Sequence, residues 1–137
     1  MITTGDMANI IAYRCKEFGI PKVMQADNIE DGEVTEERIV VIPKQQNEGT
    51  YWNSTPIEIN VLTPNLMTDF LNLPRLNEIE AQARSIFRHR ISGNYDGESY
   101  RYTYTTIGRI ASKTLRCGWI NIKINFETLN VKNNGKN

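Results

Sequence analysis

The chain has 137 residues, of which 39% are hydrophobic, and it carries 16 basic and 16 acidic side chains. That length and composition can close one hydrophobic core without disulfides or a structural metal, so we expect a single domain over residues 1–137. Because the net charge is zero, a function based on long-range attraction to nucleic acid or to an anionic membrane is excluded.

The even total hides a charge split along the chain. Residues 1–70 contain 5 basic and 11 acidic side chains, whereas residues 71–137 contain 11 basic and 5 acidic ones. If the two halves form different faces, one copy could dock its basic side on the acidic side of the next copy. If strands from both halves share one sheet, the split has no such meaning.

The cysteines and the N-terminus indicate the compartment. Cys15 and Cys117 lie far apart and outside any CxxC or Cys/His pattern, which is typical of buried small side chains in a reducing compartment. The N-terminus has no basic segment followed by an apolar one, and no uncharged apolar run approaches the roughly 18 residues of a membrane helix. We therefore expect a cytoplasmic protein that is not secreted and has no membrane partner.

Apolar residues at helical spacing predict a first helix over residues 6–18. Thr4 or Asp6 can cap its first amides, and Gly19 ends it. The following acidic stretch, residues 26–37, has few aliphatic side chains to bury, which favours a solvated loop or an adaptable arm.

Two β-branched segments then predict a hairpin. Residues 37–43 are mostly aliphatic, which suits a strand covered on both faces, and residues 56–63 alternate apolar with polar side chains, which suits a half-buried strand. The polar connection between them ends at Tyr51 and Trp52. Trp52 at the tip of such a hairpin is too apolar to be left in water without a partner, so it is a candidate subunit contact.

The second half of the chain predicts one more helix and the closing strands. An apolar stripe predicts a helix over residues 76–90, ended by Gly93 and Asn94. Alternating patterns predict strands over residues 99–106 and 118–128, and the link between them is either a turn with short strand ends or a brief helix. The polar residues 132–137 are expected to fray.

This order of elements predicts an α+β fold. Each strand pair is adjacent in the chain, which favours a mostly antiparallel sheet of about four or five strands with two helices on one face.

The side chains that could take part in catalysis or metal binding are scattered along the sequence. The only histidine, His89, lies between two arginines at a predicted helix end, where a cationic side chain suits the helix dipole, and it has no nucleophile or carboxylate nearby. The acidic residues Asp27, Glu30, Asp31 and Glu33 lack the spacing of a calcium-binding EF-hand loop. We therefore predict no enzyme activity, no catalytic or metal-binding residues and no cofactor.

A metal-dependent nuclease is the enzyme alternative, because Glu58 and Lys123 both lie on predicted strands. Such a site usually places a carboxylate pair and a following lysine at short spacing on one strand, and this chain has no such group. We rank this alternative below a role in binding or assembly.

A tyrosine stripe on the strand over residues 99–106 allows three interpretations. The rings of alternating tyrosines, with cationic residues further along, can pack in the sheet and core, form a protein interface, or stack on single-stranded bases. No RNA-binding signature accompanies them. Together with the hairpin tip, the candidate protein-interface residues are Tyr51, Trp52, Tyr100, Tyr102, Tyr104, Arg109 and Arg116.

Three segments and the element order carry a family resemblance. The segments are the strand Pro56 to Leu62, the helix Glu78 to Phe87 and the closing strand Trp119 to Phe126. In this layout the chain resembles the tail terminator, tail-completion and head-to-tail joining proteins of long-tailed bacteriophages. The resemblance runs from Met7 to about Val131, and it rests on hydrophobic patterns, so no functional residue is carried over.

The resemblance implies a structural virion protein. Such domains assemble as rings in the phage neck, where the ring caps the tail tube or joins head to tail and leaves a channel for DNA. The implied partners are other copies of this chain in a homo-oligomeric ring, a hexamer being one option, together with neck, connector and tail tube proteins, with DNA only as passing cargo. The implied location is the virion neck or tail after assembly in the host cytoplasm. The alternative is a monomeric adaptor or regulatory module that binds one partner through its sheet edge or hairpin tip.

Overall fold

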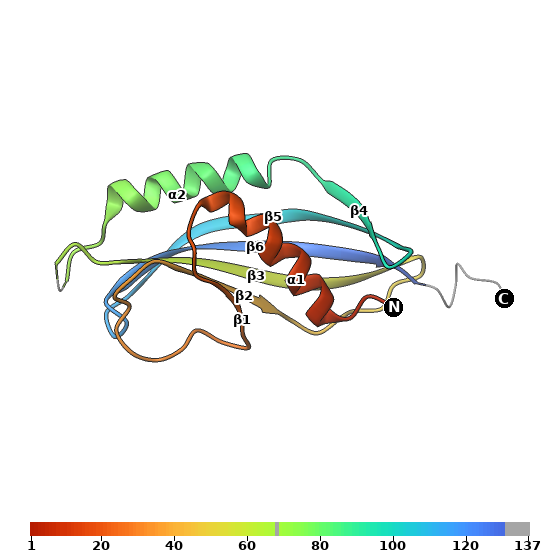
Figure 1. The fold of residues 1–137 in the computed structure, drawn as a ribbon, viewed down its shortest axis with the longest axis horizontal. Helices are drawn as coiled ribbons and strands as arrows, with labels where there is room; N and C mark the ends of the chain where they lie inside the picture. Colours follow the sequence, from red (N-terminus) through yellow and green to blue (C-terminus); the bar gives the residue numbers. More distant parts are fainter. Residues whose placement is uncertain (68, 131–137) are drawn as a thin grey trace.

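The computed structural model describes residues 1–67 and 69–130. Within them, six strands form one twisted sheet and two helices pack on one of its faces (Figure 1). The predicted α+β class and the two helices are confirmed. The sheet is mostly antiparallel, as predicted, with one parallel pair of neighbours, but it has six strands where about four or five were predicted. The predicted frayed tail over residues 132–137 lies outside the described residues.

The elements follow one another along the chain in this order: α1 (Thr4–Arg14), the 3-10 helix η1 (Cys15–Phe18), β1 (Val23–Gln25), β2 (Arg38–Pro43), β3 (Trp52–Pro64), α2 (Leu73–Ile86), β4 (Ile91–Tyr95), β5 (Glu98–Ser112) and β6 (Cys117–Leu129). In space the strand order is β1-β2-β3-β6-β5-β4, and every pair except β1–β2 is antiparallel. Because β3 lies beside β6, strands from both halves of the sequence share one sheet.

A capping box begins α1. The Thr3 hydroxyl accepts a hydrogen bond from the Asp6 amide at 3.0 Å, and the Asp6 carboxylate accepts one from the Thr3 amide at 2.9 Å. The prediction that Thr4 or Asp6 is the cap is therefore wrong, since Thr4 is already helical and Asp6 is the reciprocal partner. Gly19, with a φ of 75°, follows η1 and turns the chain towards β1.

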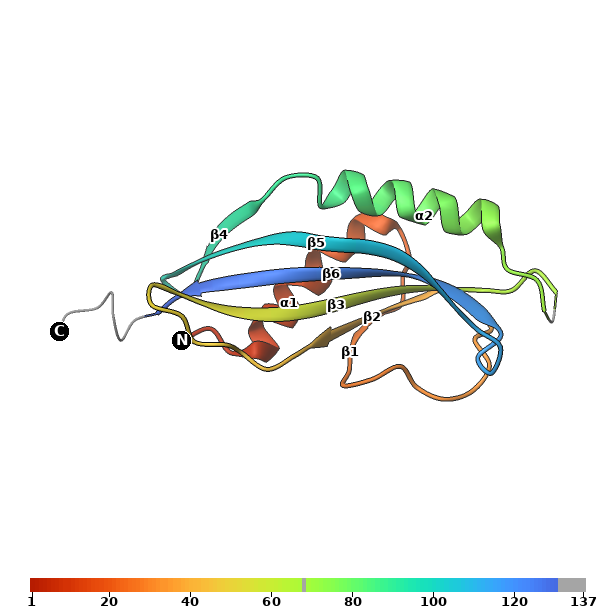
Figure 2. The same cartoon turned by 180° about the vertical axis from the view of Figure 1, so that it is seen from behind.

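The main core lies between the helices and the sheet. Alternate residues of β3 and β6 point to this face, among them Ile57, Ile59, Ile122 and Phe126, all fully buried. Helix α1 covers β1 and β2, and α2 covers β5 and β6. This two-layer arrangement buries the apolar stripe of each helix and leaves the other face of the sheet without a helix, as seen from behind in Figure 2.

A smaller core lies on that other face, at one end of the sheet. Residues 26–37 fold over it, and Val34 packs there with Val40, Leu62 and Leu115. The Val34 amide also donates a hydrogen bond to the Leu115 carbonyl at 2.8 Å. The prediction of a solvated loop is wrong for this part of the segment, because Val34 is buried, Ala26 and Ile29 pack against the same core, and backbone hydrogen bonds hold the segment to the sheet. This cover explains why β2 is apolar on both faces.

Two boundaries differ from the sequence prediction. Helix α2 ends at Ile86 rather than at residue 90, and Gly93 and Asn94 belong to β4, which turns into β5 through Asp96 and Gly97. Both turn residues have positive φ, 51° and 83°, as a tight hairpin turn requires. The link predicted between the last two strands instead extends both of them, so that β5 and β6 form one long hairpin.

Candidate functional site

The sheet face without helices carries a polar network at its centre. The Asn121 side-chain amide donates hydrogen bonds to Asn60 Oδ1 at 2.8 Å and to Glu58 Oε1 at 3.0 Å. Lys44 Nζ lies 3.5 Å from the other Glu58 oxygen. Asn60 and Asn121 are only 2% and 7% exposed, so their side-chain amides bind within this network instead of water. We call this group, Lys44, Glu58, Asn60 and Asn121, the polar sheet face.

The network does not resemble a metal-dependent nuclease centre. The register places Glu58 opposite Lys123, but the Glu58 carboxylate already binds Asn121 and Lys44. Among residues 1–67 and 69–130, no group of three or more His, Cys, Asp or Glu side chains could hold a metal ion. The geometry therefore adds no support to that alternative.

The tyrosine stripe lies on the helix side of the sheet. Tyr102 is buried between Phe87 and Phe126, with ring centroids 6.4 and 5.6 Å away, and burial raises its pKa to about 12. Tyr100 stacks on Phe126 with centroids 5.3 Å apart and is half-buried, as is Tyr104. Core packing thus accounts for Tyr102, while Tyr100 and Tyr104 keep part of their surface available.

Trp52 has a partner within its own chain. The Arg101 guanidinium lies 3.8 Å from the centre of the indole ring, and Arg101 Nε is 2.8 Å from Glu127. This cation–π contact covers the half-buried ring. Its neighbour Tyr51 is exposed.

The seven predicted interface residues do not form one surface. Trp52 pairs with Leu129 at one end of β6, whereas Arg116 lies in the turn before the other end and contacts Glu33 at 3.5 Å. Thirteen residues of strand separate these ends, which is about 40 Å. Arg109 lies near the Arg116 end and is exposed. The prediction that these side chains contact a partner stays a prediction, and no single partner surface spans all of them.

An exposed apolar loop between β3 and α2 is the feature that sequence reasoning missed. Leu66, Met67 and Phe70 are 64%, 70% and 65% exposed. The loop is closed by hydrogen bonds from the Leu66 amide to the Phe70 carbonyl at 2.8 Å and from the Phe70 amide to the Met67 carbonyl at 3.3 Å. We call these three residues the apolar tip. Their composition signals burial, but only the structure shows that the described residues leave them largely exposed.

A groove between the α1–η1 segment and strands β4 and β5 is lined by aromatic and aliphatic side chains, together with the charged Arg14, Lys16 and Glu17. Its volume is about 430 Å³, and its apolar lining includes Ile10, Tyr13, Ile91 and Tyr100. Tyr13 is largely exposed, and Lys16 Nζ lies 4.9 Å from the centre of its ring at the rim. We call the surface formed by Ile10, Tyr13, Ile91 and Tyr100 the tyrosine groove. The α1–η1 segment and strands β4 and β5 build it together, so no local sequence pattern could predict it.

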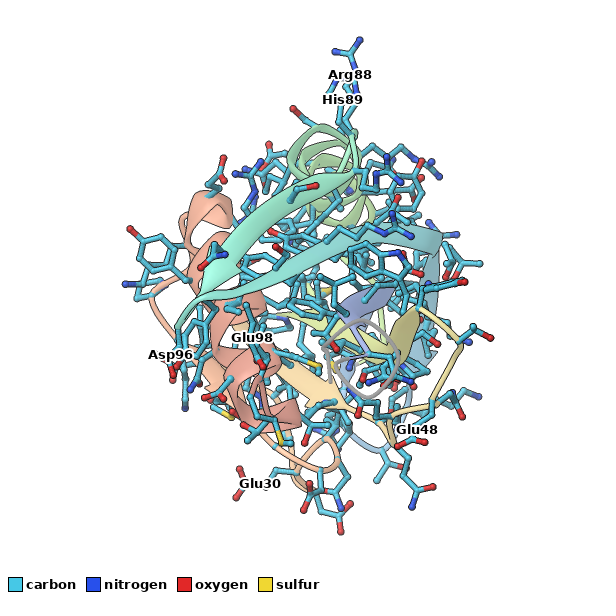
Figure 3. All side chains as sticks on the ribbon, turned by 90° about the vertical axis from the view of Figure 1, so that its right-hand side faces the viewer. Glu30, Glu48, Arg88, His89, Asp96 and Glu98 are labelled. Atoms are coloured by element: carbon cyan, nitrogen blue, oxygen red, sulfur yellow. The ribbon has the colours of Figure 1, made fainter. Side chains whose placement is uncertain are left out.

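The charge split does not separate the molecule into two faces. Ion pairs join the halves, including Arg75 with Glu37 at 2.8 Å and Arg116 with Glu33 at 3.5 Å. Figure 3 nevertheless shows Arg88 and His89 projecting at one side of the molecule and Glu30 at the opposite side. The hypothesis of opposed charged halves is therefore wrong as stated, although opposite charges do project from opposite sides.

Neither α1 nor α2 combines the length and the apolar character that a membrane crossing requires, and the described residues contain no other α-helix.

Comparisons with known proteins find likenesses among solved structures. No family model and no curated protein match the chain. A chain from the solved structure titled "Virion of native gene transfer agent (GTA) particle" is 12% identical, with a TM-score of 0.49, over 87% of this chain and 86% of that chain. A likeness of this strength carries no argument about function.

Proposed function

We propose that this protein is a structural component of a phage-type virion, repeating as a ring in the neck that caps the tail tube or joins head to tail. The apolar tip is the observation that supports an assembly role. Fully burying side chains such as Leu66, Met67 and Phe70 is worth about 1.5–3 kcal/mol each. A loop that holds three such side chains in water is typical of a binding surface.

The positions of the apolar tip and the tyrosine groove favour contact between copies of the chain. The apolar tip and the tyrosine groove lie on different parts of the surface, and Glu30 and Arg88 project from opposite sides (Figure 3). A contact that joins two different patches of identical chains is heterologous, and it closes into a ring when the rotation between neighbours allows. A mechanical role of this kind needs no catalytic residue, and we assign none.

The virion context comes from the three segments that resemble tail terminator and tail-completion proteins, and not from the likeness to the gene transfer agent virion. A monomeric adaptor is the second candidate, because the outer edge of β4 pairs with no other strand among the described residues and could accept an added strand.

A nonsense mutation in a phage that carries this gene tests the proposal. We expect filled heads separated from tails, or tails of abnormal length, with both defects repaired by the intact gene supplied in trans. Infectious particles of normal form would contradict the neck role. A monomer in dilute solution would not decide between ring and adaptor, because a ring part can close only on its template.

A further inference from the structure

We propose that the apolar tip of one copy inserts into the tyrosine groove of the next copy, with Asp69, which directly precedes Phe70, pairing with Lys16 at the groove rim. This inference rests on the proposed ring and names the contact that builds it. Three observations support it: the distance between the two features within one chain, their matching chemistry, and their complementary charges.

The tip cannot reach the groove of its own chain. It lies directly before the N-terminal end of α2, while the groove lies at the C-terminal end of that helix, where Arg14 Nη2 donates a hydrogen bond to the Ile86 carbonyl at 3.1 Å. The 14 residues of α2 span about 20 Å. The tip and the groove therefore contact each other only between molecules.

The chemistry of the two features matches. Leu66, Met67 and Phe70 are unbranched at Cβ and exposed, and the groove offers the rings of Tyr13 and Tyr100. A methionine sulfur against an aromatic ring and a phenylalanine packed on a tyrosine are both favourable contacts. The groove continues into a smaller cavity of about 280 Å³ beside Tyr95, so it has room for more than one side chain of the tip.

The charges at the two features are complementary. Asp69 is exposed beside Phe70 and has no ion pair among the described residues. At the groove rim, Arg14 and Glu17 neutralise each other at 2.9 Å, while Lys16 has no carboxylate partner in the described part of the chain. Insertion of the tip brings the free carboxylate to the free ammonium, which favours one orientation of the neighbouring copy.

Charge reversal tests the contact. We expect Asp69→Lys and Lys16→Glu each to weaken self-association of the full chain about tenfold, because each places like charges together. The two single variants mixed in equal amounts should regain association, since the reversed tip then meets the reversed groove. Sedimentation velocity over a concentration series measures this, with Lys123→Glu on the opposite face as the charge control and circular dichroism as the check of folding.

Cross-linking supplies a direct measurement. With Met67→Cys and Tyr13→Cys in one chain, we expect a ladder of covalent oligomers under mild oxidation, while each single variant remains largely monomeric on a denaturing gel. The native cysteines, Cys15 and Cys117, are buried and do not interfere.

The outcomes separate the two proposals. If the wild-type chain forms no closed oligomer at any concentration or on tail tubes, the proposed ring fails. If the ring forms but the single charge reversals leave it unchanged, or the mixture does not regain association, the contact between tip and groove is overturned while the ring stands.

Discussion

The Arg75 guanidinium binds the Glu37 carboxylate through two hydrogen bonds, Nε to Oε2 at 2.8 Å and Nη2 to Oε1 at 2.9 Å. The Thr63 hydroxyl donates a third bond to the same carboxylate at 2.7 Å. Because Glu37 precedes β2, Thr63 belongs to β3 and Arg75 lies in the first turn of α2, this cluster ties the start of α2 to two strands. It also holds the base of the loop that carries the apolar tip.

We expect Glu37→Gln to lower the free energy of unfolding by about 1–2 kcal/mol at neutral pH, because a bidentate charged bond is lost from a partly exposed site. The Arg75 bonds hold the pKa of Glu37 below its ordinary value. The stabilisation by the Glu37 carboxylate is therefore fully present above the ordinary pKa of a glutamate. It is lost as the pH falls through the lowered pKa of Glu37 in the folded chain.

Urea unfolding at neutral pH and at about pH 3 measures this difference, which should shrink in acid. Glu36→Gln is the matched control, since Glu36 pairs with Lys22 on the open surface and should cost about 0.5 kcal/mol or less. Equal losses for the two variants would contradict the structural role of Glu37.

The polar sheet face gives a second prediction. Asn121→Ala removes both amide hydrogen bonds and leaves the buried Asn60 oxygen without its donor, so we expect a loss of about 1–3 kcal/mol in unfolding free energy. Asn125→Ala, on the same face of the same strand, removes no side-chain hydrogen bond among the described residues and should cost less than half as much. The denaturant midpoints of the two variants measure this difference, provided that the slope of unfolding free energy against denaturant concentration is the same for both.

Alkaline pH gives a third prediction, because burial raises the pKa of the Cys15 thiol from 9.0 to about 12. The unfolded chain releases this proton near pH 9, while the folded chain keeps it until about pH 12. The free energy of unfolding should therefore fall above pH 9 by up to about 1.4 kcal/mol per pH unit, with Tyr102 adding to the slope above its ordinary pKa.

The Cys15→Ala variant should lose the part of this slope that begins near pH 9, whatever its stability at neutral pH. Alkylation provides a second measurement, since only the unfolded chain should expose the thiol. A native chain that reacts at Cys15 as fast as the urea-unfolded chain would refute the assignment.

The sequence predicted the elements whose hydrophobic period matches their burial. The alternation over residues 56–63 is the part of β3 that faces the core, and the apolar stripe of α2 faces β5 and β6. It missed β1 and β4, since an edge strand of three to five residues is held by pairing with its neighbour more than by its own pattern. The outer part of β5 was missed for a related reason: both of its faces are largely exposed there.

The candidate site was less predictable than the fold. Trp52 is half-buried within its own chain, because Arg101 covers its ring from a strand 49 residues away, a pairing that no local pattern encodes. Conversely, Leu66, Met67 and Phe70 have the composition of core residues, and their exposure follows only from the way that β3 and α2 leave the loop beyond the sheet. In both cases the tertiary arrangement, and not the local sequence, decides whether the side chain is covered or exposed.

Gly93 gives the last prediction, which concerns the tyrosine groove. This glycine lies in β4 directly opposite Tyr100 of β5, and a Cβ added there would overlap the Tyr100 phenol. The ring therefore lies over the glycine, in the space that a side chain would fill. We expect Gly93→Ala to displace the ring, to lower the unfolding free energy by about 1–3 kcal/mol and to weaken self-association through the altered groove.

Gly108→Ala is the matched control, because Gly108 also lies in a strand of the same sheet and, apart from its chain neighbours, no described residue has an atom within 4 Å of the added Cβ. Its effect on stability should be small, and association should not change. A double-mutant cycle with Tyr100→Leu then isolates the coupling: if the ring is what the methyl group displaces, Gly93→Ala should cost much less when Tyr100 is already absent. If Gly93→Ala lowers the unfolding free energy by the same amount in both backgrounds, the strain lies in the β4 backbone. The stability of β4 would then not depend on the position of the Tyr100 ring in the groove.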